Sequence, residues 1–317
     1  MTASSPRPAS PSWRGEPLST VNESNAMRPA WFDAHLSTRD FERLRIVIER
    51  YAGIRMPDAK STMLESRLRH RLRDLGIEDF GEYAALVLRS RPQDAEFVRF
   101  IDCVTTNKTD FFRERGHFDY LAQTTWPTLA TELGAGLDRE LVVWCAASST
   151  GEEPYTLAMV LSEVAARTPG LRFRIIATDL STEVLERAQR GVYTDAQVEP
   201  VPLHMRMKYL MRSKDRSQGL VRVTPALRSL VRFGRLNLVD DDWPVRERVD
   251  IIFCRNVFIY FDRKMQEAIL RRFCRQLVPG GYVFLGHAEA INGHDVPLKS
   301  VGPTTYRTAS TNNGVRA

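Results

Sequence analysis

The spacing of apolar residues changes character near residue 115 of this 317-residue chain. Before that point, apolar residues recur every three or four positions, as they do on the buried face of a helix. The ranges that follow this pattern are 37–54, 58–76, 79–90 and 92–105. Ser37 or Thr38 can cap the first of these helices, and Gly53 and Gly76 follow the first and second. The pattern predicts a small all-helical domain, which with its linker covers residues 29–115.

After that point, short apolar runs alternate with helical patterns. The expected strands are 141–147, 173–180, 231–238, 249–257 and 281–287, the last of them after a Pro-Gly-Gly turn; the expected helices are 155–167, 181–190 and 262–277. This alternation predicts βαβ units in a doubly wound, mostly parallel sheet with helices on both faces. We expect this α/β domain at residues 116–312, with a small β-subdomain inserted at about 205–230, where the alternation is interrupted.

Composition narrows the class of protein. Residues 1–28 are rich in Ser, Pro and Thr and are expected to be a disordered leader, and residues 313–317 a short tail. No apolar run approaches the ~20 residues of a membrane span, and no signal peptide is recognisable, so we expect a cytoplasmic protein without membrane insertion. The four cysteines show no metal-ligand spacing and are expected to be reduced core residues: Cys103, Cys145, Cys254 and Cys274. The net charge of +6 fits an acidic partner.

Candidate chemistry begins in 141-LVVWCAASSTGEEPYT-156, where a strand runs into a small-residue loop and a helix start. In open parallel sheets, ligands bind at the carboxyl ends of the strands. The loop has neither a dinucleotide nor a P-loop glycine pattern, and the carboxylates of Glu152 and Glu153 would repel a pyrophosphate. It therefore suits a cationic ligand, although Glu152 can equally be a helix-start charge that complements the helix dipole.

A second candidate is Asp179, at the end of the second expected strand. An acidic side chain at this position can accept two hydrogen bonds from the vicinal hydroxyls of a ribose. A ribose-binding acid, extra carboxylates and no pyrophosphate loop together favour S-adenosylmethionine, whose sulfonium and ammonium groups are cationic.

Three segments, 105-TTNKTDFFRE-114, 144-WCAASSTGEEPYT-156 and 253-FCRNVFIYF-261, resemble in order and spacing the CheR-type chemotaxis receptor methyltransferases. The resemblance covers about residues 37–309. It implies a Rossmann-like class I S-adenosylmethionine-dependent methyltransferase, active as a monomer. Such an enzyme would methylate glutamate side chains in the cytoplasmic helical region of methyl-accepting chemoreceptors during adaptation, with S-adenosylhomocysteine as product. Neither nucleic acid nor a metal is implied.

The resemblance also assigns roles to individual residues. The cofactor would be held by Asn107, Thr109, Arg113, Glu153, Asp179, Asn237, Leu238, Arg255 and Asn256. Arg113 would face the reacting carboxylate and Tyr260 would lie beside the transferred methyl group, so these two are the expected catalytic residues. Without the resemblance, Arg113 would be a surface ion-pair residue and Tyr260 a core aromatic. His117 and His287 are expected to be structural.

A basic helix supplies a candidate docking surface. The arginines Arg67, Arg69, Arg71 and Arg73 flank the leucine stripe Leu64, Leu68, Leu72 and Leu75. The simplest interpretation of these arginines is that they form a solvated face beside the buried leucine stripe. The resemblance implies instead that they dock on the acidic receptor, with binding that weakens as the salt concentration rises. In the inserted subdomain, 213-SKDRSQG-219 stands where tethering family members carry a glycine-rich loop, which disfavours β-augmentation by a receptor peptide.

Two other functions compete with the receptor methyltransferase. A regulatory module that binds but does not turn over is disfavoured because Arg113 and Tyr260 are retained. An RNA methyltransferase is suggested by the arginine content, but the basic helix lacks stacking aromatics. The absence of an Asn/Asp-Pro-Pro-Tyr/Phe segment also disfavours methylation of a base or amide nitrogen.

Overall fold

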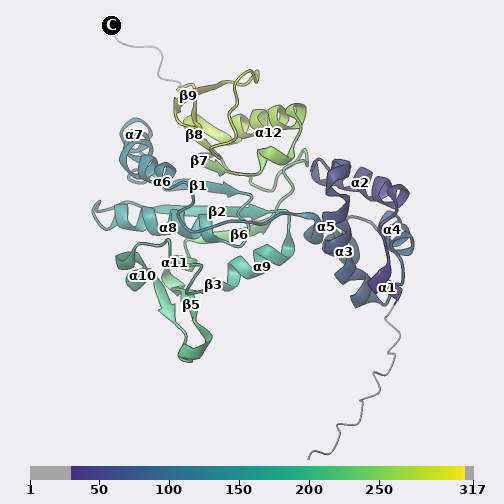
Figure 1. Cartoon of the computed structure of the whole chain (residues 1–317). Coiled ribbons are helices and arrows are strands. Elements are labelled where there is room, and N and C mark those ends of the chain that lie inside the picture. Colours follow the sequence, from purple (N-terminus) through teal and green to yellow (C-terminus); the bar gives the residue numbers. More distant parts are fainter. Residues whose placement is uncertain (1–29, 311–317) are drawn as a thin grey trace, which may run out of the picture.

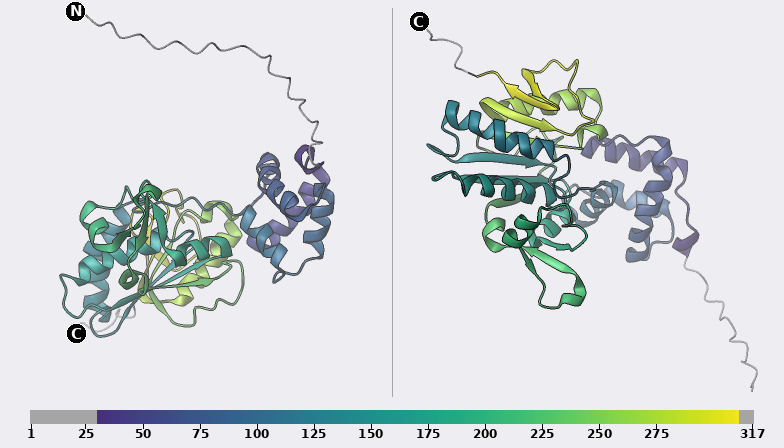
Figure 2. Two further views of the ribbon diagram at one scale, coloured as in Figure 1. Left: turned by 90° about the horizontal axis from the view of Figure 1, so that it is seen from below. Right: turned by 60° about the vertical axis from the view of Figure 1, so that its left-hand side comes forward.

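The computed structural model describes residues 30–310 and contains a bundle of short helices beside an α/β domain (Figure 1). Figure 2 shows the same two parts from two further directions, with the bundle against one end of the sheet. The expected leader at 1–28 and tail at 313–317 lie outside the described residues.

The helical part consists of α1 (Ala30–Asp33), α2 (Thr38–Ala52), η1 (Asp58–Lys60), α3 (Ser61–Leu75), α4 (Phe80–Arg89) and α5 (Ala95–Val104). The Ser37 hydroxyl caps α2 by accepting a hydrogen bond from the Asp40 amide, and Gly53 ends it in the left-handed conformation. The range expected as one helix, 58–76, begins instead with the 3-10 turn η1.

The leucine stripe of α3 ends earlier than predicted. Leu64, Leu68 and Leu72 are buried, whereas Leu75 is 41% exposed. The reason is the left-handed turn at Gly76, which folds Ile77 back so that its amide donates to the Leu72 carbonyl and its side chain is buried in place of Leu75.

The α/β part is built on a seven-stranded sheet in the order β6-β2-β1-β7-β8-β10-β9. The strands are β1 (Leu141–Ala146), β2 (Phe173–Asp179), β6 (Val231–Arg235), β7 (Val249–Cys254), β8 (Leu277–Leu285), β9 (Leu298–Gly302) and β10 (Thr305–Thr308). The first five are parallel, and β10 pairs antiparallel with both β8 and β9. The predicted doubly wound, mostly parallel sheet is confirmed, and its order reverses between β1 and β7.

Helices cover both faces of this sheet. Val143 and Cys145 of β1 pack in one core with α6 (Gly116–Tyr120), the π-helical turn η2 (Leu121–Thr125), α7 (Trp126–Leu133) and α8 (Glu152–Ala165). Trp144 and Ala146 pack in a second core with α12 (Arg263–Gln276). A strand buried on both faces reads as a continuous apolar run, which is why β1 was recognisable in the sequence. None of the helices among residues 30–310 is long and apolar enough to cross a membrane.

The inserted subdomain is larger than predicted. It comprises β3 (Val192–Thr194), α10 (Leu203–Tyr209), β4 (Leu210–Arg212), η3 (Arg216–Gln218), β5 (Leu220–Val223) and α11 (Pro225–Arg228) after α9 (Thr182–Arg190). Its antiparallel sheet has the order β3-β5-β4. The boundary near 205 is wrong because β3 is a three-residue strand with two exposed side chains. Gly219 does take the left-handed conformation before β5, with φ of 57°.

Several strand boundaries also differ from expectation. β6 ends at Arg235 and β7 at Cys254, and the Pro-Gly-Gly segment lies inside β8 rather than before it. Gly280, with φ of 80°, allows the irregularity there, since the pairing of β7 with β8 shifts register between Val249 and Ile251. All four cysteines are free; Cys145 and Cys254 are buried as predicted, but Cys103 and Cys274 are only partly buried.

Candidate functional site

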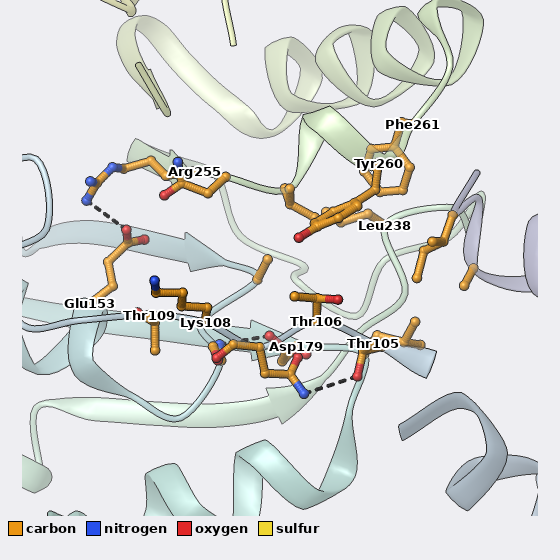
Figure 3. A pocket seen from close by; sticks show the side chains of 18 of the residues that line it. Thr105, Thr106, Lys108, Thr109, Glu153, Asp179, Leu238, Arg255, Tyr260 and Phe261 are labelled. Atoms are coloured by element: carbon orange, nitrogen blue, oxygen red, sulfur yellow. Dashed lines mark hydrogen bonds and ion pairs between the residues drawn. The ribbon is translucent and has the colours of Figure 1, made fainter. Parts of the chain in front are cut away.

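A solvent-open pocket with an empty volume of about 890 Å³ lies at the carboxyl ends of β1, β2, β6 and β7, where the strand order reverses (Figure 3). The helical part closes it through Ala52, Ile54 and the linker 105–109. All ten residues expected to bind the cofactor or act in catalysis line this one pocket: Asn107, Thr109, Arg113, Glu153, Asp179, Asn237, Leu238, Arg255, Asn256 and Tyr260.

Asp179 is fixed at the pocket wall by the backbone around it. One carboxylate oxygen accepts the Ser149 amide at 2.8 Å and the other accepts the Ser181 amide at 3.0 Å. Burial raises the pKa of the Asp179 carboxyl, while these two amides oppose the rise. A carboxylate offers about four lone-pair sites, so Asp179 can still accept a hydrogen bond from a hydroxyl group in the pocket.

Glu153 and Arg255 form a buried ion pair across the pocket. Nη1 of Arg255 lies 2.9 Å from Oε2 of Glu153, and Oε1 of Glu153 accepts from the Cys145 thiol at 3.1 Å. Nη2 of Arg255 also lies 3.0 Å from Oε2 of Glu114. Burial raises the pKa of Glu153, against the opposing effect of the Arg255 guanidinium. Arg255 is therefore the shared counter-ion of Glu153 and Glu114.

Glu152 lies outside the pocket, at the first residue of α8. Its carboxylate is buried, accepts from the Thr150 hydroxyl at 2.6 Å and approaches the Gln197 amide at 3.5 Å. Burial raises its pKa, and no arginine or lysine pairs with it among residues 30–310. Of the two adjacent glutamates, only Glu153 can reach a ligand in the pocket.

Non-glycine residues with left-handed backbones gather around the pocket: Phe112, Glu114, Ala147, Ser149 and Asn256, with φ between 47° and 65°. Such conformations cost about 1–2 kcal/mol each and persist where surrounding contacts enforce them. For Asn256 the enforcing group is Glu289, whose carboxylate accepts the amides of Asn256 at 2.7 Å and Gly286 at 2.6 Å. Glu289 was not identified from the sequence. The sequence feature that could have drawn attention to it is an acidic residue within the apolar and small-residue stretch 284-FLGHAEAI-291.

The linker that closes the pocket is held from both sides. Arg67 of α3 donates through Nη1 to the carbonyls of Val104 at 2.7 Å and Thr105 at 2.9 Å. From the sheet side, the Ser149 hydroxyl donates to the Asn107 carbonyl at 2.9 Å. The pocket-lining segment therefore depends on contacts with both parts of the protein.

Comparisons with known proteins agree with this division. Residues 39–105 match the family model "CheR methyltransferase, all-alpha domain" and residues 107–307 match "CheR methyltransferase, SAM binding domain". The chain belongs to the CheR methyltransferase family. The resemblance drawn from the sequence motifs is thereby confirmed, as is the class I methyltransferase fold with its helical N-terminal domain.

Curated relatives are similar over most of their length. The chemotaxis protein methyltransferase of Salmonella typhimurium is 40% identical over 271 residues, which are 86% of this chain and 90% of that protein. The Escherichia coli protein is 41% identical over 86% of this chain and 91% of its own length. Chemotaxis protein methyltransferase 2 of Pseudomonas aeruginosa is 37% identical, over 87% and 95% respectively.

Both expected catalytic residues of this CheR-family chain line the pocket. Arg113 is half-buried, and its Nη1 donates to the Lys108 carbonyl at 3.0 Å; no carboxylate within the described residues forms an ion pair with it. Tyr260 is half-buried, its hydroxyl directed into the pocket (Figure 3), and the Lys60 ammonium lies 5.6 Å from its ring centroid. Both side chains can therefore meet a substrate.

Two further pocket residues are engaged by neighbouring backbone. The Asn237 amide group donates to the Tyr51 carbonyl at 2.8 Å, and its oxygen accepts the Val239 amide at 3.2 Å. Asn237 therefore joins the β6 loop to α2 in addition to lining the pocket. Leu238 lies beside it and is buried.

Exposure of the basic helix was predicted wrongly for three of its four arginines. Arg71 is only 7% exposed, because it forms a two-pronged ion pair with Glu96 at 2.6 and 3.1 Å. Arg69 donates to the Trp31 and Phe32 carbonyls, and Arg67 to the linker described above. Arg73 alone of the four has an exposed side chain, at 53%, with Asp74 as its partner.

Proposed function

We propose that this CheR-family methyltransferase transfers a methyl group from S-adenosylmethionine to glutamate side-chain carboxylates of methyl-accepting chemoreceptors. The products are glutamate methyl esters and S-adenosylhomocysteine, formed during chemotactic adaptation. The observation that carries the proposal is Arg113, a guanidinium without a carboxylate partner in the described chain, which lines a pocket suited to the cofactor. The names of the curated relatives support the chemotactic setting.

The residues of the pocket fit S-adenosylmethionine, which when bound supplies an electrophilic methyl group on a sulfonium. Asp179 has lone pairs left for the ribose hydroxyls after accepting two amides. Leu236, Leu238 and Phe261 provide apolar surface for an adenine ring, and Glu153 with Arg255 provides a matched pair for the charged ends of the methionine moiety. Asn107, Thr109 and Asn256 line the remaining walls.

Catalysis by this chain would rest on positioning. A glutamate carboxylate is already ionised near neutral pH, so no side chain need act as a general base. Arg113 can fix the substrate carboxylate through a two-pronged hydrogen bond, and the Tyr260 hydroxyl can donate one more. Alignment of reacting atoms at about 3–3.5 Å in a site shielded from water then supplies most of the rate gain.

The partner we propose is the helical cytoplasmic region of a chemoreceptor, docked on the helical domain beside the pocket. Arg73 remains the candidate contact on α3, since its charged end is exposed. We propose that the protein acts in the cytoplasm as a monomer, without nucleic acid.

The test is methyl transfer from labelled S-adenosylmethionine to receptor-containing membranes, with RNA as a parallel substrate. We expect the receptor to become labelled and the RNA to stay unlabelled. The label should be released by base, because carboxyl methyl esters are base-labile. Arg113→Ala is expected to lower the transfer rate at least about 100-fold, or ~2.7 kcal/mol, with little change in S-adenosylhomocysteine affinity.

The matched control is Arg115→Ala, two residues away, with a side chain 65% exposed and only a 4.0 Å contact to Asp119. It should transfer methyl groups at the wild-type rate. Label on RNA, or no label on any receptor, would refute the proposal that chemoreceptors are the substrate. Equal losses of transfer and cofactor affinity in Arg113→Ala would instead make Arg113 a cofactor residue.

A further inference from the structure

A cluster of three potential metal ligands lies directly behind the cofactor pocket. Oε2 of Glu114 is 3.5 Å from Nδ1 of His117 and 3.9 Å from Nε2 of His287. The ligand atoms of these three residues all lie within 4.8 Å of one another, and the two imidazole rings meet edge to face with centroids 5.0 Å apart. Because His287 follows β8, far along the chain from the other two, no local spacing could reveal the cluster.

One ring nitrogen of His117 has no hydrogen-bond partner among the described residues. The ring is 3% exposed, and the nitrogen without a partner is Nδ1, which is buried. Nε2 lies 3.0 Å from the Thr304 hydroxyl, which can accept a hydrogen bond from it. In the tautomer that carries its proton on Nε2, the Nδ1 lone pair faces the Glu114 carboxylate, 3.5 Å away.

In that tautomer Nδ1 and Oε2 of Glu114 are two acceptors that face each other at 3.5 Å, and Nδ1 is the one without a donor, since Oε2 already accepts from Arg255 and the His287 amide. A buried acceptor left without a donor costs roughly 1–3 kcal/mol, and a cation bound between the two atoms would remove that cost for Nδ1. The arrangement also matches that of metal-binding histidines, which typically donate their other ring N–H to a carbonyl or hydroxyl.

The charge around the cluster leaves the Glu114 carboxylate available to a cation. The Arg255 guanidinium is shared between the carboxylates of Glu114 and Glu153 at 3.0 and 2.9 Å. The Arg113 guanidinium also acts on Glu153, so two carboxylates and two guanidiniums balance one another. The Asn256 amide and the His287 backbone amide also contact Glu114, which holds the carboxylate in place.

We propose that Glu114, His117 and His287 form a binding site for a divalent transition-metal ion of the Zn²⁺ type. Bonds of about 2.0–2.1 Å to a tetrahedral ion put neighbouring ligand atoms about 3.4 Å apart, against 3.5 and 3.9 Å from Oε2 of Glu114 and at most 4.8 Å among all three ligand atoms here. Two imidazoles and one carboxylate select such ions over Mg²⁺ and Ca²⁺, which prefer oxygen ligands. The His287 side chain, 59% exposed, gives the ion an entry path.

The test uses the full-length protein, purified without a histidine tag and freed of metal by chelation. Titration with Co²⁺ should give the visible absorption of a tetrahedral ion at one ion per chain, and calorimetry should show Zn²⁺ binding with the same stoichiometry. His287→Gln removes an exposed ligand at little cost to the fold. It should weaken binding of both ions at least tenfold.

His35→Gln is the matched control, because His35 is exposed and 3.5 Å from Oε1 of Glu65 but belongs to no such three-residue cluster. It should bind metal as the wild type does. His117→Asn, with thermal unfolding to check that it folds, should also lose the site. Absence of stoichiometric binding, or equal binding by wild type and His287→Gln, would overturn the proposal.

Discussion

At the scale of single residues, the shape of the pocket depends on carboxylates that accept hydrogen bonds from backbone amides. Asp179 accepts two amides, from Ser149 and Ser181, and Glu289 accepts those of Gly286 and Asn256. These carboxylates fix loops with left-handed residues, so one group both shapes the backbone and, for Asp179, faces the cavity. The two roles can be separated by comparing stability with affinity.

Asp179→Ala should weaken binding of S-adenosylhomocysteine at least about tenfold, equivalent to ~1.4 kcal/mol, because the acceptor for the ribose hydroxyls is lost. Isothermal calorimetry measures the affinity directly. Asp79→Ala serves as the control, since Asp79 also accepts a backbone amide, from Glu82, but lies far from the pocket. Unchanged affinity in Asp179→Ala would refute the ribose assignment.

Glu152 should make stability depend on pH. Burial raises its pKa in the folded protein, so the folded state binds a proton more tightly than the unfolded chain does. The stabilisation from that proton is complete below the unfolded pKa of about 4.5 and is lost as pH rises through the raised folded value. A tenfold difference in proton affinity between the two states corresponds to about 1.4 kcal/mol. Glu152→Gln should therefore gain stability over wild type as pH rises from about 4 to 8.

Thermal unfolding across that pH range tests this. Glu186→Gln, an exposed change on α9, should follow the wild-type curve. A Glu152→Gln curve parallel to wild type at every pH would show that burial does not control this carboxyl.

At the scale of elements, α3 holds the linker rather than presenting a uniform basic face. Arg67→Ala removes the donor to the Val104 and Thr105 carbonyls and should lower cofactor affinity roughly threefold or more, because the linker lines the pocket. Arg73→Ala should leave cofactor affinity unchanged and raise the KM for receptor at low salt. Calorimetry and salt-dependent kinetics distinguish them; identical behaviour of both variants would contradict the division.

Helices and strands were predictable from the sequence where a long run of residues buries one or both of its faces. β1 and β2 stand out as apolar runs, and α2 has a capping serine at its start and a glycine at its end. The strands β3, β9 and β10 were missed because they are only three to five residues long, have at most two buried side chains each, and depend for their conformation on their sheet neighbours.

The site was predictable to a different degree. Ten of the pocket-lining residues were named from the sequence, because they fall in three contiguous motifs and at strand ends. The role of Glu289 and the contact of Glu114 with His287 could not be predicted from the sequence. In both cases the partners come from distant segments that only the folded sheet brings together. The buried state of Arg71 was missed because its partner Glu96 belongs to another helix.

At the scale of the whole molecule, the pocket belongs to two domains at once, so their relative placement should control cofactor binding. Besides the Asn237 contact to Tyr51, the Asp102 carboxylate of α5 accepts the Thr182 amide at 3.0 Å and the Thr182 hydroxyl at 2.8 Å, at the start of α9. Figure 1 shows α5 and α9 at this junction.

Asp102→Ala removes both of these contacts without touching a pocket residue. We expect a three- to tenfold loss of S-adenosylhomocysteine affinity, equivalent to about 1 kcal/mol, because the helical domain then closes the pocket less often. Asp94→Ala, at the residue just before α5 and bonded within its own domain to Arg91, should bind as wild type does. Calorimetry on both variants decides the matter: equal affinities would mean that Asn237 and the linker alone hold the domains in the binding position.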